Sequence, residues 1–130
     1  MGAYCTGIKE DGANARGGSG SCVKLNPSST TDKLIWTFLV PTTAVTAFQL
    51  TFWHKITASY NGSLKCTIYD TDNTTKLLNA EAVSFTDDAA YHQYTATSTE
   101  PTTTGFCRVV LEILDGAVSG DIYVDDVSTV

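Results

Sequence analysis

The sequence predicts an all-β fold in which two antiparallel sheets pack face to face. A chain of 130 residues is the size of one domain with a substantial core. It contains 21 threonines together with many valines and aromatic residues, which suit a pleated, half-buried strand. Short apolar or alternating segments are separated by turn signals, with no convincing helix between them. This pattern is typical of a β-sandwich or barrel and excludes a parallel βαβ arrangement.

About eight strands are expected along the chain. Residues 1–20 are glycine-rich and polar, and they are expected to form a loop. Pro41 marks a break between two strands, and Asn61-Gly62 is a strong hairpin signal. Segment 76–82 could form one helical turn, but a strand that ends at Phe85 is favoured. The expected strands cover residues 21–25, 33–40, 47–56, 64–69, 76–85, 91–97, 106–114 and 122–129.

The charge balance and hydropathy exclude two classes of partner. The net charge is −6, and the basic residues are scattered, whereas a nucleic-acid site needs clustered Lys and Arg. No segment reaches the roughly 18–20 apolar residues of a membrane span. The segment Met1–Gly7 has neither the basic nor the apolar region of a secretory signal. We therefore expect either a protein released from the cytoplasm or a piece of a longer secreted protein.

Four cysteines allow three disulfide connectivities, and their spacing matches no zinc pattern. Cys66 and Cys107 lie in apolar strand patterns, where a buried free thiol is the common state. A bridge between Cys5 and Cys22 is the alternative for the other two.

Two adjacent carboxylates, Asp125 and Asp126, interrupt the apolar run of the last expected strand. Neighbouring side chains of a strand point to opposite faces, so one of the two should point inward unless a bulge intervenes. A buried carboxylate requires hydrogen-bond donors, a cationic partner or a metal.

A candidate carbohydrate site comes from the strand 47–56. Its alternation places Phe48, Leu50 and Phe52 in the core and turns Gln49, Thr51 and Trp53 to a polar face. An indole can stack on a sugar ring while planar polar side chains bind hydroxyls; the alternative is that Trp53 packs under a loop. Trp36 shares the apolar face of its own strand and is assigned to the core. The candidate ligand-binding residues are Trp53, Gln49, Tyr69, Tyr94 and Arg108, with Tyr91 and Glu112 as further members.

No pattern in the sequence predicts catalysis. His54 and His92 have no neighbour with a matching role and are expected to be solvated. The four glutamates lie in no recognisable active-site motif, and neither a Gly-x-Ser-x-Gly elbow nor a phosphate-binding loop is present. We therefore expect a protein that is not an enzyme.

Three segments resemble the carbohydrate-binding-module type of galactose-binding jelly roll: residues 18–25, residues 35–53 and the closing segment Phe106–Val127 with its Tyr-Val-Asp-Asp-Val run. The resemblance implies a jelly roll and a closing hairpin. It also implies a structural calcium ion with Asp125 as its ligand and Asp126 as second choice, completed by carbonyl oxygens and by Glu10, Asp11 or Asn14. The alternative is that both aspartates are solvated or bonded to nearby backbone.

Two functions follow from the resemblance, because such jelly rolls also occur as decoration and tail proteins of phage virions. The first is a virion protein that docks on a capsid or tail in several copies on a symmetric lattice. It is favoured by the methionine start, the end directly after the last strand and the threonine-rich composition. The alternative is a calcium-stabilised carbohydrate-binding module, excised from a secreted extracellular glycosidase or adhesin.

Overall fold

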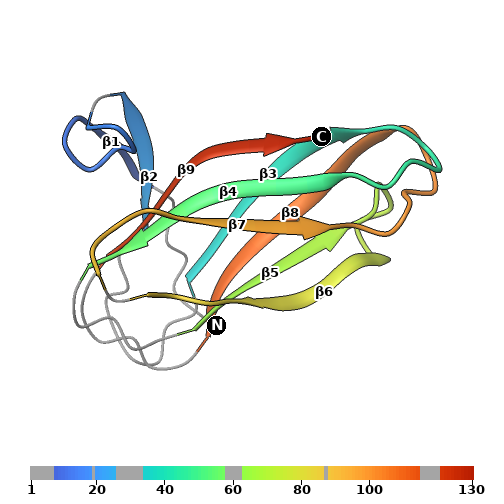
Figure 1. Ribbon diagram of the computed structural model, residues 1–130. Helices are drawn as coiled ribbons and strands as arrows, with labels where there is room; N and C mark the ends of the chain where they lie inside the picture. Colours follow the sequence, from blue (N-terminus) through green and yellow to red (C-terminus); the bar gives the residue numbers. More distant parts are fainter. Residues whose placement is uncertain (1–7, 19, 26–33, 58–62, 87, 115–120) are drawn as a thin grey trace.

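The computed structural model describes residues 8–18, 20–25, 34–57, 63–86, 88–114 and 121–130, and within them the chain forms nine strands and no helix that could span a membrane. The five-stranded sheet has the order β1-β2-β9-β4-β7, and the four-stranded sheet has the order β3-β8-β5-β6, both antiparallel (Figure 1). This confirms the predicted two-sheet jelly-roll sandwich. The strands are β1 Ile8–Asp11, β2 Ser21–Leu25, β3 Leu34–Thr42, β4 Gln49–Ile56, β5 Ser63–Tyr69, β6 Lys76–Val83, β7 His92–Thr97, β8 Gly105–Leu114 and β9 Ile122–Thr129.

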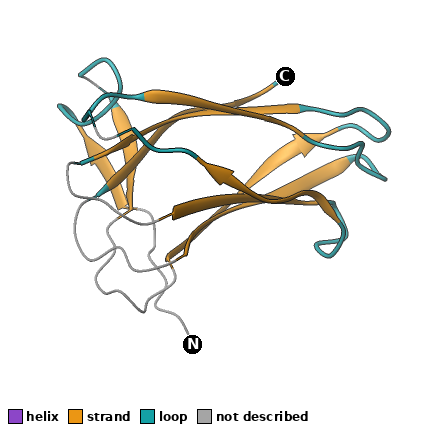
Figure 2. Ribbon diagram, turned by 60° about the horizontal axis from the view of Figure 1, so that its bottom comes forward, coloured by secondary structure: helices purple, strands orange, loops and turns teal. Residues whose placement is uncertain are grey.

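The core fills the space between the two layers, which Figure 2 shows one above the other. Alternate residues of each central strand enter it, because successive side chains of a strand point to opposite faces. Trp36 and Phe38 pack against this core with their ring centroids 4.8 Å apart, as the alternation predicts. The fully buried apolar members are Leu50, Phe52, Leu64, Cys66, Ile68, Cys107, Val109, Leu111 and Ile122.

The strands differ from the sequence prediction at two places: β1 is an additional strand, and β3 is longer than expected. Residues 8–11, expected to be a loop, form β1 and pair with β2, with Lys9 opposite Val23. Their mostly polar sequence gives no apolar alternation, so the strand depends on its pairing partner. Pro41 does not end its strand, since β3 continues to Thr42. β3 is an edge strand, where a proline without an N–H removes no ladder hydrogen bond.

Both expected hairpins are wrong, because the strands they would join lie in different sheets. β4 belongs to the five-stranded sheet and β5 to the four-stranded sheet, and the same separation holds for β9 and β8. A turn signal such as Asn61-Gly62 marks a reversal of the chain but does not fix the pairing partner. Residues 58–62 and 115–120 themselves, and Cys5, lie outside the described residues.

Two of the cysteines are buried reduced thiols, as expected. Cys66 and Cys107 lie in the core, and burial raises the pKa of the Cys66 thiol to about 12. Cys22 is buried in a separate small cluster with Ala15 and Tyr123. A bridge from Cys22 to Cys5 would involve a residue outside the described part of the chain.

A buried carboxylate fastens one end of the sandwich. Asp70 is fully buried at the end of β5, and its Oδ2 accepts hydrogen bonds from the Thr102 backbone N–H (3.0 Å) and hydroxyl (2.7 Å). Its Oδ1 accepts the backbone N–H of Thr71 at 2.7 Å. Burial alone would raise the pKa of Asp70, but the hydrogen bonds from Thr102 and Thr71 outweigh it and hold the pKa below its usual value. The turn after β5 is thereby joined to the loop before β8.

The expectation that His54 is solvated is wrong. His54 is only 3% exposed, because it has the same parity along β4 as Leu50 and Phe52. Its ring lies edge-on to Phe85 at 5.4 Å. Burial lowers the pKa of His54 to about 4, with a smaller contribution from His92. His92 itself is half-buried, and its Nε2 lies 2.9 Å from Asp88 Oδ1.

This burial predicts a pH dependence of stability. An unfolded histidine titrates near pH 6.5, whereas the native His54 ring stays neutral down to about pH 4. The unfolded state therefore binds a proton that the native state does not, and the free energy of unfolding should fall between about pH 6.5 and about pH 4. We expect His54→Leu to reduce the dependence of the free energy of unfolding on pH, measured in urea titrations. His92→Asn should keep the contribution of His54 to that dependence. An identical slope in the wild type and in His54→Leu would contradict the assignment.

Candidate functional site

The candidate site lies on the outer face of the five-stranded sheet, the face turned away from the core, at Trp53. Trp53 occupies the middle of β4, where the alternation turns it away from Phe52 and the core. Across the sheet its register partners are Gln93 on β7 and Asp125 on β9. An indole therefore lies between an amide and a carboxylate in one row that crosses three strands.

Arg16 covers the indole from the loop between β1 and β2. Its guanidinium carbon lies 3.9 Å from the Trp53 ring centroid, a close cation–π contact. Its Nη1 donates to Asp126 Oδ2 at 2.5 Å, and its backbone N–H donates to Asp125 Oδ2 at 2.8 Å. We call these four residues the Arg16 junction. This arrangement matches the alternative in which Trp53 packs under a loop.

A β-bulge explains how both aspartates reach the same arginine. The pairing of β4 with β9 shifts between Thr51, opposite Ser128, and Trp53, opposite Asp125, so β9 has one extra residue there. Asp126 adopts a left-handed backbone conformation with φ of 48°, as bulges allow. The two carboxylates therefore lie on the same side of the sheet, and neither enters the core.

The described contacts of these two carboxylates are hydrogen bonds from protein N–H groups. Asp125 Oδ1 accepts the N–H of Asp126 at 2.7 Å, and Oδ2 accepts the N–H of Arg16. Calcium requires six to eight oxygen ligands; no cluster of three or more metal-binding side chains occurs among the described residues, and the calcium ion stays a prediction. The Asn14 carbonyl, another expected ligand, accepts the Tyr91 hydroxyl at 2.7 Å. The side chains of Glu10 and Asp11 lie outside the described part of the chain.

A second contact anchors the same loop. The ammonium group of Lys55 lies 5.0 Å from the Tyr91 ring centroid and 4.9 Å from that of Tyr123. It also donates to the Asn14 carbonyl oxygen at 3.4 Å. Burial, the largest cause, raises the pKa of Tyr91 above its ordinary value. The loop is thus held on the sheet at two places, Asn14 and Arg16.

The other predicted ligand residues are distributed over three places. Gln49 shares the outer face with Trp53 but lies four residues away along β4, about 13 Å at the usual strand rise. Tyr94 is 9% exposed, packs in the core against Phe52 and donates to Glu81 Oε1 at 2.7 Å.

The remaining candidates lie on the four-stranded sheet. Tyr69 and Arg108 are register partners there, and the guanidinium carbon lies 4.6 Å from the tyrosine ring centroid. Arg108 Nε is buried and has no hydrogen-bond partner among the described residues. Glu112 follows on the same face of β8. Trp53 and Tyr69 therefore belong to different layers of the sandwich and do not form one platform.

Two members of the site were missed by sequence reasoning. Gln93 could have been found, because the alternation of β7 exposes it while Tyr94 is buried. Arg16 gave no signal, since it lies in a glycine-rich loop with no periodicity.

The fold is similar to several solved structures. The Family 16 Carbohydrate Binding Module-2 superposes with a TM-score of 0.65 and 23% identity, covering 95% of this chain and 86% of its own. TmCBM61, solved in complex with beta-1,4-galactotriose, gives 0.62 and 9% identity over 91% and 75%. The chain has the jelly-roll fold of carbohydrate-binding modules.

A phage protein shares this carbohydrate-binding-module-like fold. The enzymatically active domain of tailspike protein 4 from Bacteriophage CBA120 superposes with a TM-score of 0.68 and 13% identity, covering 99% of this chain but 18% of that one. No protein-family model and no curated protein matches the sequence.

The Arg16 junction predicts how the loop is stabilised. Arg16→Ala should lower the free energy of unfolding by about 1–2 kcal/mol, the size of a cation–π contact plus a partly exposed ion pair. Because the guanidinium supplies the positive charge, EDTA should leave the melting temperature unchanged. Arg16→Lys keeps the charge but loses the planar stack, and should be intermediate. A melting temperature that falls with EDTA and recovers with calcium would contradict this account.

Proposed function

We propose that the chain is a non-catalytic carbohydrate-binding module whose glycan lies on the outer face of the five-stranded sheet at Trp53. One observation carries the proposal: the row Gln93–Trp53–Asp125, with Arg16 fixed above the indole. It combines a half-buried indole, covered by a guanidinium, with planar polar side chains on one face of the sheet.

The chemistry of these groups suits a sugar. The Arg16 side chain is 41% exposed and that of Asp126 is 53% exposed, so donors and acceptors of the pair are accessible to sugar hydroxyls. Gln93 is exposed and can both donate and accept. The Arg16 guanidinium above the indole and the accessible part of Trp53 would contact the C–H face of a pyranose ring.

The arrangement is also preorganised. Arg16 is held by Asp125, Asp126 and Trp53 before any ligand arrives. A long side chain that is already ordered loses less rotamer entropy on binding. The fold shared with the Family 16 module and with TmCBM61, which was solved with a galactotriose, supports the proposal.

Glycan-array binding of the purified chain tests it, with beta-1,4-galactotriose included. We expect Trp53→Ala and Gln93→Ala each to weaken the binding about tenfold or more, since both remove a central contact. Phe106→Ala is the matched control, because it removes a 61% exposed aromatic side chain from the other sheet. A folded sample that binds no glycan, or binding lost equally in Phe106→Ala, would overturn the proposal.

A second candidate function, attachment to a phage virion, is supported by the tailspike domain that shares this fold. The four-stranded sheet offers a surface for such docking. Leu39 is 62% exposed and Phe106 is 61% exposed, and the register places them beside Arg108 and Pro41. Large apolar side chains with a central arginine are common at protein interfaces.

The virion role makes a separate prediction. Mass spectrometry of density-banded virus particles should detect the chain in a fixed ratio to the major capsid protein, because docking on a symmetric lattice fixes the copy number. Recombinant chain should rebind stripped particles, and Leu39→Ser with Phe106→Ser should prevent this. Absence from washed particles would exclude the role.

A further inference from the structure

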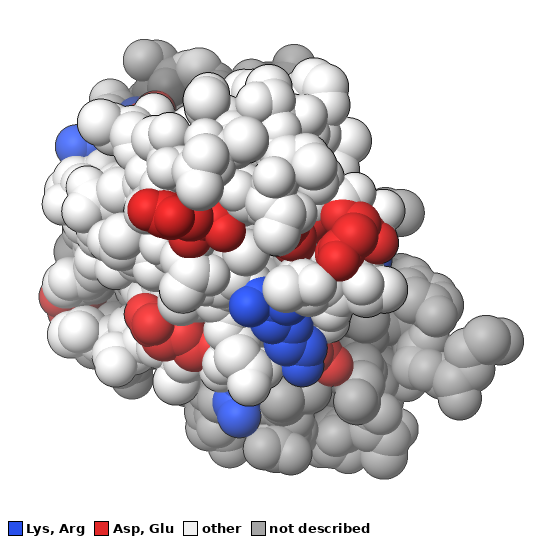
Figure 3. Space-filling model, turned by 90° about the vertical axis from the view of Figure 1, so that its right-hand side faces the viewer, with Lys and Arg blue, Asp and Glu red and all other residues white. Residues whose placement is uncertain are grey.

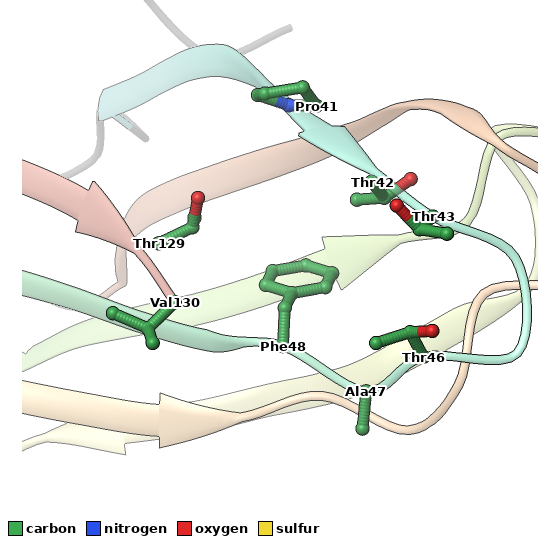
Figure 4. Close-up of a pocket in the computed structure, with 8 residues that line it drawn as sticks. All are labelled: Pro41, Thr42, Thr43, Thr46, Ala47, Phe48, Thr129 and Val130. Atoms are coloured by element: carbon green, nitrogen blue, oxygen red, sulfur yellow. The ribbon is translucent and has the colours of Figure 1, made fainter.

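A second concave site lies near the start of β4, away from the Arg16 junction. It is a hollow of about 250 Å³ between the end of β3, the segment 43–48 and the end of β9. The Phe48 ring, a core residue that is 7% exposed, forms part of its floor, with Thr42, Thr46 and Thr129 around the ring (Figure 4). Pockets for drug-sized ligands are typically about 300–1,000 Å³, so this hollow suits a smaller molecule.

The lining indicates a neutral ligand that carries hydroxyl groups. No side chain that lines the hollow is charged, so a charged ligand would find no side-chain counter-charge there. Both carboxylates and basic groups lie on this side of the molecule, so the surface around the hollow carries no single sign of charge (Figure 3). A purely aliphatic ligand would leave the threonine hydroxyls without partners.

Several of those hydroxyls are available. Thr42 is already engaged, since its Oγ1 donates to the Gly105 carbonyl oxygen at 3.4 Å. The hydroxyls of Thr43 and Thr129 have no hydrogen-bond partner among the described residues. Thr46 Oγ1 donates to the Ala44 carbonyl oxygen at 3.3 Å and can still accept a hydrogen bond. The hollow therefore combines one aromatic ring with a rim of hydroxyl groups.

The walls are held in place by backbone hydrogen bonds. Gln49 and Val130 exchange two of them, at 2.9 and 3.0 Å, which fixes the end of β9 beside β4. The Phe48 N–H donates to Ser98 Oγ at 3.1 Å, and the Ala44 N–H donates to Thr104 Oγ1 at 3.0 Å. A ligand would meet a site that needs little ordering.

The loop that walls the hollow also contains a strained residue. Val45 has φ of 50°, a conformation that is unusual for a β-branched side chain. Its N–H donates to the Pro101 carbonyl oxygen at 2.9 Å, so tertiary contacts maintain it. Backbone strain of this kind costs about 1–3 kcal/mol and is concentrated at ligand-binding segments.

We infer that this hollow binds one neutral sugar unit, either a free monosaccharide or the terminal unit of a glycan chain. The ring of Phe48 would contact the C–H face of the sugar, and Thr43, Thr46 and Thr129 would bind its hydroxyls. The inference is independent of the proposed site at Trp53, because it uses other residues and another part of the sandwich.

The test is an NMR titration of the ¹⁵N-labelled chain with D-galactose and, separately, with D-glucose. At least one sugar should give saturable amide shifts concentrated in residues 43–48 and 129–130. The double variant Thr46→Val, Thr129→Val keeps side-chain volume but removes two hydroxyls, and should weaken this binding about tenfold or more. Thr97→Val, an exposed threonine of β7 outside the hollow, is the matched control.

Three results would overturn the inference. They are no saturable shift around the hollow with either sugar, unchanged affinity in the double variant, and equal binding of cyclohexanol, a ring of similar size with one hydroxyl. Shifts confined to Trp53 and Gln93 would reject the hollow while supporting the outer-face site. Shifts at the hollow that survive Trp53→Ala would support the hollow on its own.

Discussion

The β-bulge between β4 and β9 is the constraint on which the outer-face site depends. Without the extra residue, strict alternation would send one of two adjacent aspartates into the apolar core. With it, Asp125 and Asp126 both contact Arg16, and the loop between β1 and β2 becomes fastened over Trp53. One irregularity in register thus places both carboxylates beside Arg16 and keeps the guanidinium over the half-buried indole.

Alternation explains most of what the sequence predicts correctly. It places Leu50 and Phe52 in the core and Gln49 and Trp53 on the outer face. The same alternation predicts a buried His54, because the parity of a position along a strand applies to polar residues as well. At His54 the two-residue period of the strand outweighs the polar character of the imidazole.

The sequence does not show which distant segments of the chain pair with one another. Tyr69 and Trp53 have similar strand contexts, yet β5 and β4 lie in different layers, so these rings cannot face one ligand. Arg16 shows this limit more clearly, because its hydrogen bonds to Asp125 and Asp126 join residues that are 109 and 110 positions apart in the chain. Turn signals and periodicity are local properties, and neither specifies which distant carboxylate a loop arginine will contact.

The rims of the four-stranded sheet are its edge strands, β3 and β6, and they affect how copies of this domain can associate. On one rim, Pro41 gives β3 a position with no N–H. On the other, β6 carries two register shifts against β5 and a left-handed Ala80. Neither rim offers a regular row of donors and acceptors to a strand from another molecule. Pro41 and the irregular pairing of β6 therefore disfavour continuation of the four-stranded sheet into a strand of another copy.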